Sequence, residues 1–437
     1  MSQLLAKIKN LTQSKFIRSV ILVAGGAAGA QAITMAFAPI ITRMYGPESF
    51  GLLGAFMATL GIVTPIAALA YPIAIVLPKS DDDAKGIAKL SVRIALVIAL
   101  AFSLILLVAG EQIAAVLGMQ AIAGFMLLIP LAMFFSALQQ VMQQWLIRKK
   151  QFKVMARIAV SQSFILNGSK IGVGWFWPIG PVLIILATLG NMLYAVQLWF
   201  GAKKWADSAG RIDTPAAGEV DLKALAYKHR DFPYYRAPQI FINALSQSLP
   251  VLMLASFFGP ASAGFYAIGR TVMGMPSALV GNAVGDVFYP RINEAAQSRQ
   301  NIFKLILKAT LLLGLVGIIP FGLVVVFGPW LFSLVFGQDW AMAGEYARWL
   351  SVWMFFMFMN NPSNKAIPVL GIQRFYLFFS TVTIVVRLIA LAVGFLIFSS
   401  DIVAIALFSV SGAIINISLI VIVLFASIKH QRNYHVS

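Results

Sequence analysis

The sequence predicts an all-α polytopic membrane protein with about twelve transmembrane helices in two six-helix lobes. The first reason is composition: 60% of the 437 residues are hydrophobic, 11% are charged and the mean hydropathy is +0.87. A soluble core of this length could not hide so much apolar surface. The second reason is a series of continuous apolar runs, which favour helices over a transmembrane barrel. The third is an internal repeat.

Each apolar run is long enough to cross roughly 30 Å of hydrocarbon as a helix. The first run follows a long basic segment and continues to Ile41, so we expect a retained anchor rather than a cleaved signal peptide. The predicted spans are 17–42, 50–77, 88–109, 121–147, 154–176, 178–202, 234–258, 262–289, 302–328, 346–370, 374–398 and 402–428.

Positive charge is concentrated in one set of connections between these spans. All but six of the 33 lysines and arginines lie in the terminal segments or in alternate connections, among them RKKQFK at 148–153 and the polar loop at 203–232. The positive-inside rule places these segments and both termini in the cytoplasm. Topology therefore accounts for most of the net charge of +18, and we expect no nucleic-acid partner.

A tight turn is written twice, as YGPESFG at 45–51 and as FGPASAG at 258–264. Glycine accepts positive φ and proline starts or stops a helix, so each copy is expected to join the first two helices of a lobe. A second echo pairs GEQIAAVLG at 110–118 with GPWLFSLVFG at 328–337.

A third echo pairs Lys170 with Arg387. The three echoes predict two lobes in the same orientation, with a substrate path at the repeat interface, as in transporters built from parallel repeats. We expect an N-terminal lobe at 1–203, a cytoplasmic linker with a short amphipathic helix at 204–232, and a C-terminal lobe at 233–437.

Six cations lie outside the cytoplasmic segments and are candidate substrate-binding residues. Two are near the outer ends of spans, and the other four are within spans, where a lipid-facing charge costs a few kcal/mol. We therefore expect the latter to line a protein interior or a wet cavity. These six residues are Arg43, Lys170, Arg270, Arg348, Lys365 and Arg387.

Acidic residues are nearly absent from the spans, where Asp286 is the only one. An interior with positive potential and few carboxylates favours an anionic substrate. The polar run NNPSN at 360–364 precedes Lys365, and Pro362 and Pro368 are expected to break the helix there. Since broken helices are common at transport sites, Asp286, Asn360 and Asn361 are candidates for ion coupling or gating.

Enzymatic and metal chemistry find little support. The chain has no cysteine, which excludes disulfides and thiolate metal sites, and its three histidines are expected in solvated loops. We therefore expect no catalytic residue, no metal site and no cofactor.

Four segments of the chain resemble those of a known family. They are PIITRMYGPESFG at 39–51, YKHRDFPYYRAPQ at 227–239, LPVLMLASFFGPASAGFYAIGR at 249–270 and PSALVGNAVGDVFYPR at 276–291. The chain is similar in these segments to bacterial polysaccharide flippases of the Wzx type. These belong to the MOP exporter superfamily, which also holds the multidrug MATE exporters and the peptidoglycan lipid flippase.

The resemblance implies a V-shaped pair of six-helix lobes around a central cationic cavity that alternates between two open states. The implied cargo is an undecaprenyl-pyrophosphate-linked oligosaccharide, carried across the bacterial inner membrane for O-antigen, capsule or exopolysaccharide synthesis. Implied partners are membrane lipids and the polymerase and chain-length proteins of the pathway, with H+ or Na+ as the coupling ion.

The resemblance is incomplete at the site. In the peptidoglycan lipid flippase, arginines from helices 1, 2 and 8 contact the pyrophosphate. Here Arg270 matches the arginine of helix 8, but helix 2 has no cation and Arg43 lies at the outer tip of helix 1. We expect Lys170 and Arg387 to share this role.

Two other functions stay open. A MATE-like cation-coupled multidrug exporter would need membrane carboxylates, of which the spans hold almost none. A membrane enzyme of envelope polysaccharide synthesis would need large polar loops or intramembrane His and Asp chemistry, and neither is evident in the sequence.

Overall fold

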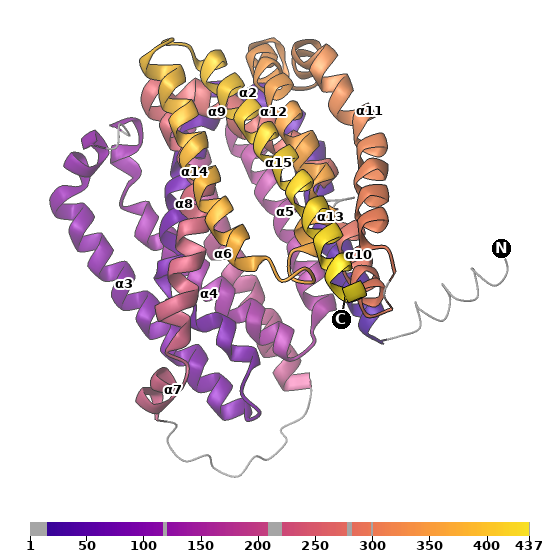
Figure 1. Ribbon diagram of the computed structural model, residues 1–437. Helices are drawn as coiled ribbons and strands as arrows, with labels where there is room; N and C mark the ends of the chain where they lie inside the picture. The colour runs from indigo at the N-terminus through magenta and orange to yellow at the C-terminus, as the bar shows by residue number, and fades with distance from the viewer. Residues whose placement is uncertain (1–14, 117–119, 209–220, 278–281, 299, 437) are drawn as a thin grey trace. The chain divides into compact units, whose positions relative to one another are not determined.

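The computed structural model describes residues 15–116, 120–208, 221–277, 282–298 and 300–436, and every regular element in these ranges is a helix (Figure 1). Seven of the described helices are long and apolar enough to cross a membrane. The predicted class, an all-α polytopic membrane protein, is confirmed. The predicted spans at 121–147, 154–176, 262–289 and 346–370 fall on helices that are shorter or more polar than these seven.

The chain forms two compact units, residues 1–252 (unit 1) and 253–437 (unit 2), and the division falls inside helix α8. The predicted lobes and linker, with their limits at 203 and 233, stay a prediction. Unit 1 contains α2 (Lys15–Ala67), η1 (Tyr71–Val76), α3 (Asp81–Val116), η2 (Gln120–Phe125), α4 (Leu128–Arg148), α5 (Phe152–Gly174), α6 (Gly180–Ser208), α7 (Leu222–Lys228), η3 (Phe232–Arg236) and the first part of α8 (Ala237–Phe258).

Unit 2 begins with the end of α8 and repeats the helix order of unit 1. The long α11 and α12, joined by η5, correspond to α3 and α4, joined by η2; α14 and α15 correspond to α5 and α6. Its elements are α9 (Pro260–Pro276), α10 (Asn282–Gln297), α11 (Ile302–Phe336), η5 (Gln338–Trp340), α12 (Ala341–Met359), α13 (Asn361–Ala366), α14 (Gln373–Leu396) and α15 (Asp401–Val436).

The repeated turn has nearly the same backbone in both copies. Gly46 has φ 70° and ψ 171°, and Gly259 has φ 90° and ψ 170°. Residues with a Cβ rarely adopt such a positive φ, so glycine is required at both positions. The helix α2 is therefore two helices joined at Gly46, which correspond to the first two predicted spans.

In unit 1 the turn packs against the end of α5 and the start of α6. The Tyr45 hydroxyl donates a hydrogen bond of 2.8 Å to the carbonyl of Lys170. Gly180 lies so close to the turn that a Cβ there would come within 3.4 Å of the Ser49 Cα and 2.6 Å of the Leu52 side chain. The turn thus fixes the second half of α2 to the last two helices before the linker.

In unit 2 the second copy packs against the corresponding helices. Phe258 lies edge-on to Phe395 of α14, with ring centres 5.5 Å apart. Ser262 donates to the Asp401 carboxylate at the start of α15, at 3.2 Å, and Tyr346 of α12 donates to the same oxygen at 2.6 Å. The repeat is therefore one of tertiary packing as well as of sequence.

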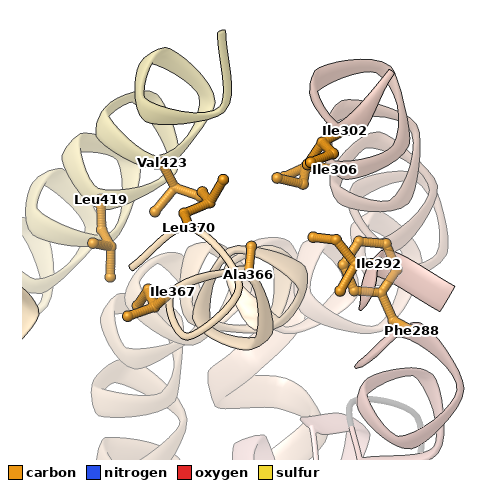
Figure 2. Close-up of a cluster of buried hydrophobic side chains, with 9 residues drawn as sticks. All are labelled: Phe288, Ile292, Ile302, Ile306, Ala366, Ile367, Leu370, Leu419 and Val423. Carbon is orange, nitrogen blue, oxygen red and sulfur yellow. The ribbon is translucent and has the colours of Figure 1, made fainter. Parts of the chain in front are cut away.

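The broken helix at residues 360–372 closes a hydrophobic cluster in unit 2. The helix α12 ends at Met359, α13 covers Asn361–Ala366, and Gly371 with φ 71° precedes α14, so the break expected at the prolines is present. Figure 2 shows side chains from α10, α11, α15 and the residues around the break pointing toward one another. They are Phe288, Ile292, Ile302, Ile306, Ala366, Ile367, Leu370, Leu419 and Val423.

At one end of unit 1, the short helix α7 packs on η1, α3 and α4 (Figure 1). Asp221 caps it by accepting from the Lys223 amide, Leu225 is buried, and the Tyr71 hydroxyl donates to the Ala226 carbonyl at 3.1 Å. The amphipathic pattern of this segment is therefore satisfied by the protein itself.

Arg148, at the end of α4, holds the neighbouring connection in place. Its guanidinium donates to Asp81 Oδ1 at 3.0 Å and to the Pro78 and Ser80 carbonyls at 2.6 and 3.1 Å. Lys149 forms a second ion pair with Asp81. At least part of the positive charge of these connections is thus used to fix the chain, in addition to setting topology.

We expect Tyr346→Phe to lower the free energy of unfolding by about 1.5–3 kcal/mol, because a hydrogen bond to a charged group contributes that much. Reversible unfolding in mixed detergent micelles would measure it. The control is Tyr376→Phe: Tyr376 is half-buried, whereas Tyr346 is fully buried, and the Tyr376 hydroxyl makes no hydrogen bond within the described ranges. An equal loss in both variants would contradict the role assigned to the Asp401 contact.

Candidate functional site

The Arg387 guanidinium in unit 2 lies between two aromatic rings. Its Cζ is 3.8 Å from the ring centre of Trp353 on α12 and 4.0 Å from that of Phe408 on α15. Trp353 can approach α15 closely because residue 412 is glycine, where a Cβ would come within 2.7 Å of the indole. Each ring attracts the cation through its π face. The side chain of Arg387 is therefore held in a fixed place.

Arg270 brings a second positive charge near Arg387. It lies on α9, four residues after Tyr266, so both project from one face of that helix. Tyr266 is buried with its ring edge-on to Phe408, 6.2 Å between centres. The positive charge of Arg270 acts unfavourably on the positive charge of Arg387.

No carboxylate of the described residues acts on the Arg387 guanidinium. The acids at the starts of α12 and α15 are engaged elsewhere: Glu345 binds Arg348, and Asp401 accepts from Ser262 and Tyr346. The Arg387 Nε is also buried without a hydrogen-bond acceptor in the described part of the chain. Adjacent cations in an acid-poor interior favour an anion, and the role of this arginine pair, Arg270 and Arg387, in substrate binding stays a prediction.

Arg348 is placed as a structural anchor. It forms an ion pair of 2.9 Å with Glu345 on its own helix and donates to the Val326 carbonyl of α11 at 3.1 Å. The two helices touch at Gly328 and Gly344, where a Cβ on Gly344 would lie 2.4 Å from the opposite carbonyl oxygen. The role of Arg348 in substrate binding stays a prediction.

Asn360 connects the broken helix to α15. Its amide donates to Asn416 Oδ1 at 2.9 Å, and Asn416 donates to the carbonyl of Gly412. Trp353 packs against this same glycine. Asn361 donates to the Phe358 carbonyl, and Lys365 lies half-buried in the last turn of α13. The side chain of Asp286 lies outside the described residues.

In unit 1, Lys170 lines a cavity of about 280 Å³ between α2, α5 and α6. It lies on α5, the helix that corresponds to α14 with Arg387, as the repeat predicts. The other polar residues of the cavity wall are Gln31, Thr34, Gln162, Ser163, Asn167 and Tyr194. Arg43, farther along α2, is exposed and is absent from this wall.

His229 departs from the expected solvated loop. It follows α7, and its Nε2 is buried without a hydrogen-bond partner in the described part of the chain. Burial lowers the pKa of His229, repulsion by Lys228 lowers it further, and the charge of Asp83 opposes both. The neutral ring is therefore the form that fits the docked linker.

Sequence reasoning missed the groups that surround the cations. Trp353 and Phe408 are apolar residues in apolar spans, and nothing local in the sequence marks them as partners of Arg387. The cavity in unit 1 could have been predicted from the sequence. Polar residues recur there at helical spacing on one face of an otherwise apolar helix: Gln162, Ser163, Asn167 and Lys170.

Comparison with known families decides the identity. A family model described as "Polysaccharide biosynthesis protein" matches residues 40–345. The chain belongs to this family. No curated protein sequence matches it significantly.

Solved structures show the same fold. The match to "Lipid II flippase MurJ, inward closed conformation" covers 95% of this chain and 91% of that structure, with a TM-score of 0.71 and 14% identity. An inward-facing MATE multidrug transporter of the MOP superfamily gives a TM-score of 0.67 at 13% identity, covering 93% of this chain and 99% of the other.

A third structure has a title that concerns its binding pocket. Its title names a MOP superfamily transporter from Pyrococcus furiosus and states that the reverse polarity of the binding pocket suggests a different function. The TM-score is 0.58 at 14% identity, and the match covers 95% of each chain. The polysaccharide biosynthesis protein therefore has the fold of the MOP superfamily, as the resemblance implied.

Removing the cation between the rings should affect stability less than removing a ring. We expect Arg387→Met to change the free energy of unfolding by less than about 1 kcal/mol, because the lost cation–π attraction is offset by relief from burying a charge. We expect Trp353→Leu to cost about 3 kcal/mol, since it leaves a cavity and an uncompensated guanidinium. Unfolding in mixed micelles compares the two, and equal losses would make Arg387 a purely structural residue.

Proposed function

We propose that this polysaccharide biosynthesis protein is a flippase that carries an undecaprenyl-pyrophosphate-linked oligosaccharide repeat unit across the bacterial inner membrane by alternating access. The proposed product is O-antigen, capsule or exopolysaccharide, and both termini are proposed to be cytoplasmic. The arginine pair of unit 2 is the observation that carries the proposal. Family membership and the shared fold support it.

A pyrophosphate is the chemical group that best matches the arginine pair. Guanidinium groups hold phosphate oxygens through paired N–H donors, and this interaction strengthens where water is excluded. Because Arg387 is already fixed between Trp353 and Phe408, little side-chain entropy is lost when the anion binds. The charged headgroup would be held there while the sugars cross the membrane.

The alternatives fit the structure less well. A cationic drug would be repelled by Arg270 and Arg387, whereas multidrug export with ion coupling calls for carboxylates in the spans. The carboxylate at the start of α15, Asp401, is already engaged by Tyr346 and Ser262. A membrane enzyme of polysaccharide synthesis finds no support in the described side chains, where acids and histidines form no metal-binding group.

The proposal extends to ion coupling and to partners. Asp286, Asn360 and Asn361 remain the candidates for coupling to H+ or Na+ or for gating. The Asn360 Oδ1 is buried and accepts no hydrogen bond from the described residues, which supports its candidacy. Membrane lipids surround the helices, and the polymerase and chain-length proteins of the pathway are the proposed protein partners.

Export of a surface polysaccharide tests the site. In a deletion strain complemented with variants, Arg270→Ala and Arg387→Ala should each reduce export by roughly 10- to 100-fold, because each removes a charge-assisted contact of about 1.5–3 kcal/mol. Arg270→Lys should fall between the wild type and Arg270→Ala if charge suffices, and should match Arg270→Ala if paired N–H contacts are essential.

The matched control is Arg291→Ala. This arginine lies in the same unit, exposed on α10 and beside Glu294, so its loss should leave export unchanged. Protein levels in the membrane must be equal in all strains. Full export by both Arg270→Ala and Arg387→Ala would refute the cationic site.

A further inference from the structure

The cavity in unit 1 is formed by one polar face of α5. Gln162, Ser163, Leu166, Asn167 and Lys170 line it with the spacing i, i+1, i+4, i+5, i+8, which covers about 12 Å along one side of a helix. The opposite wall is α2, and α6 adds Tyr194. All of these residues belong to unit 1, and the cavity is a groove with an open side.

Part of the wall is a closed network of hydrogen bonds. Thr34 and Ser163 hydroxyls lie 2.9 Å apart and both reach the Ala30 carbonyl, at 3.0 and 2.7 Å. Asn167 donates to the Ser163 carbonyl at 2.8 Å and to the Thr34 hydroxyl at 3.3 Å. These groups satisfy one another, which gives a rigid polar surface whose remaining lone pairs can contact a ligand.

Two groups of the wall lack a partner among the described residues. Gln162 is 8% exposed and donates to the Gly190 carbonyl at 2.7 Å, but its Oε1 is buried and accepts no hydrogen bond. No acceptor or carboxylate within the described ranges pairs with the Lys170 ammonium. Acids are also distant in the sequence, since none occurs between Glu111 and Asp207.

These two groups demand different things from a ligand. A buried carbonyl oxygen without a donor costs about 1–3 kcal/mol, so Gln162 calls for a hydroxyl or amide hydrogen. The Lys170 ammonium calls for a negative charge, because an unpaired cation inside the membrane is costly. An anion without a hydrogen to donate, such as chloride, would satisfy only Lys170, and a neutral sugar would leave the charge of Lys170 without an opposite charge.

The volume limits the size of the ligand. Pockets that hold small molecules usually exceed about 300 Å³, so 280 Å³ suits a single sugar ring rather than an oligosaccharide. We propose that this cavity binds an acidic monosaccharide, a pyranose whose carboxylate contacts Lys170 and whose hydroxyls donate to Gln162 and contact the polar surface of Thr34, Ser163 and Asn167. The proposed flippase function further implies that the cargo contains an acidic sugar, and this implication rests on that function.

Direct binding to the purified full-length protein in nanodiscs tests the inference, with D-glucuronate as probe. D-glucose has the hydroxyls without the charge, and acetate has the charge without the hydroxyls. Saturation-transfer NMR and titration should show glucuronate binding at least 10-fold more tightly than either. Equal binding of glucose, or equal binding of acetate, would overturn the inference.

Variants separate the two contacts. Lys170→Met should weaken glucuronate binding at least 10-fold and remove its preference over glucose, whereas Lys170→Arg should retain the preference. Gln162→Met should weaken glucuronate and glucose alike. Lys308→Met, at an exposed lysine of α11, is the matched control and should bind like the wild type. Unchanged glucuronate binding by Lys170→Met would overturn the inference.

This experiment is independent of export. Because folding is checked by thermal unfolding, loss of binding in a variant with an unchanged Tm reports the site itself. If wild-type protein fails to bind glucuronate while export still depends on Arg270 and Arg387, only the acidic-sugar inference fails. If glucuronate binds and export is indifferent to both arginines, the proposed flippase site fails and the sugar site stands.

Discussion

The cost of a positive charge inside a membrane is the constraint on which the sites of this protein depend. A cation facing lipid is expensive, so the protein must surround it. Unit 2 surrounds Arg387 with the faces of Trp353 and Phe408, and unit 1 surrounds Lys170 with hydroxyl and amide groups. Neither solution uses a carboxylate within the described residues. Both arrangements therefore agree with the proposal that each cation contacts an anionic ligand.

The two units share a framework and differ in polar content. Gly46 and Gly259 give the two copies of the turn nearly the same backbone conformation. The turn contacts α5 and α6 in unit 1 and the corresponding helices, α14 and α15, in unit 2. The contacts themselves have diverged: Tyr45 donates a hydrogen bond, whereas Phe258 at the equivalent position packs edge-on to a ring. Because backbone geometry carries the packing, side chains at the equivalent positions were free to acquire separate functions. The two cations are an instance of that freedom.

The sequence predicted the class, the repeat and the positions of the cations, because hydropathy, glycine and charge are local signals. It did not predict what surrounds each cation. Trp353 and Phe408 are 55 residues apart in the sequence, and only the fold brings them to Arg387. His229 was expected in solvent, yet the docking of α7 buries its Nε2. Tertiary contacts of apolar and linker residues leave no pattern that a single sequence displays.

Acidic residues clarify why positive charge remains uncompensated at the sites. Asp401 ties α15 to α9 and α12, Glu345 holds Arg348, and Asp81 holds the connection before α3 through Arg148 and Lys149. Asp81 and Asp401 lie at helix starts, where a carboxylate interacts favourably with the helix dipole and stabilises the framework, whereas Glu345 lies one turn into α12. A carboxylate next to Arg387 or Lys170 would have relieved the cost of burial but would have competed with an anionic ligand for the same charge. The framework is therefore stabilised by these acids, and the acid-poor interior agrees with the anionic ligands proposed for Arg387 and Lys170.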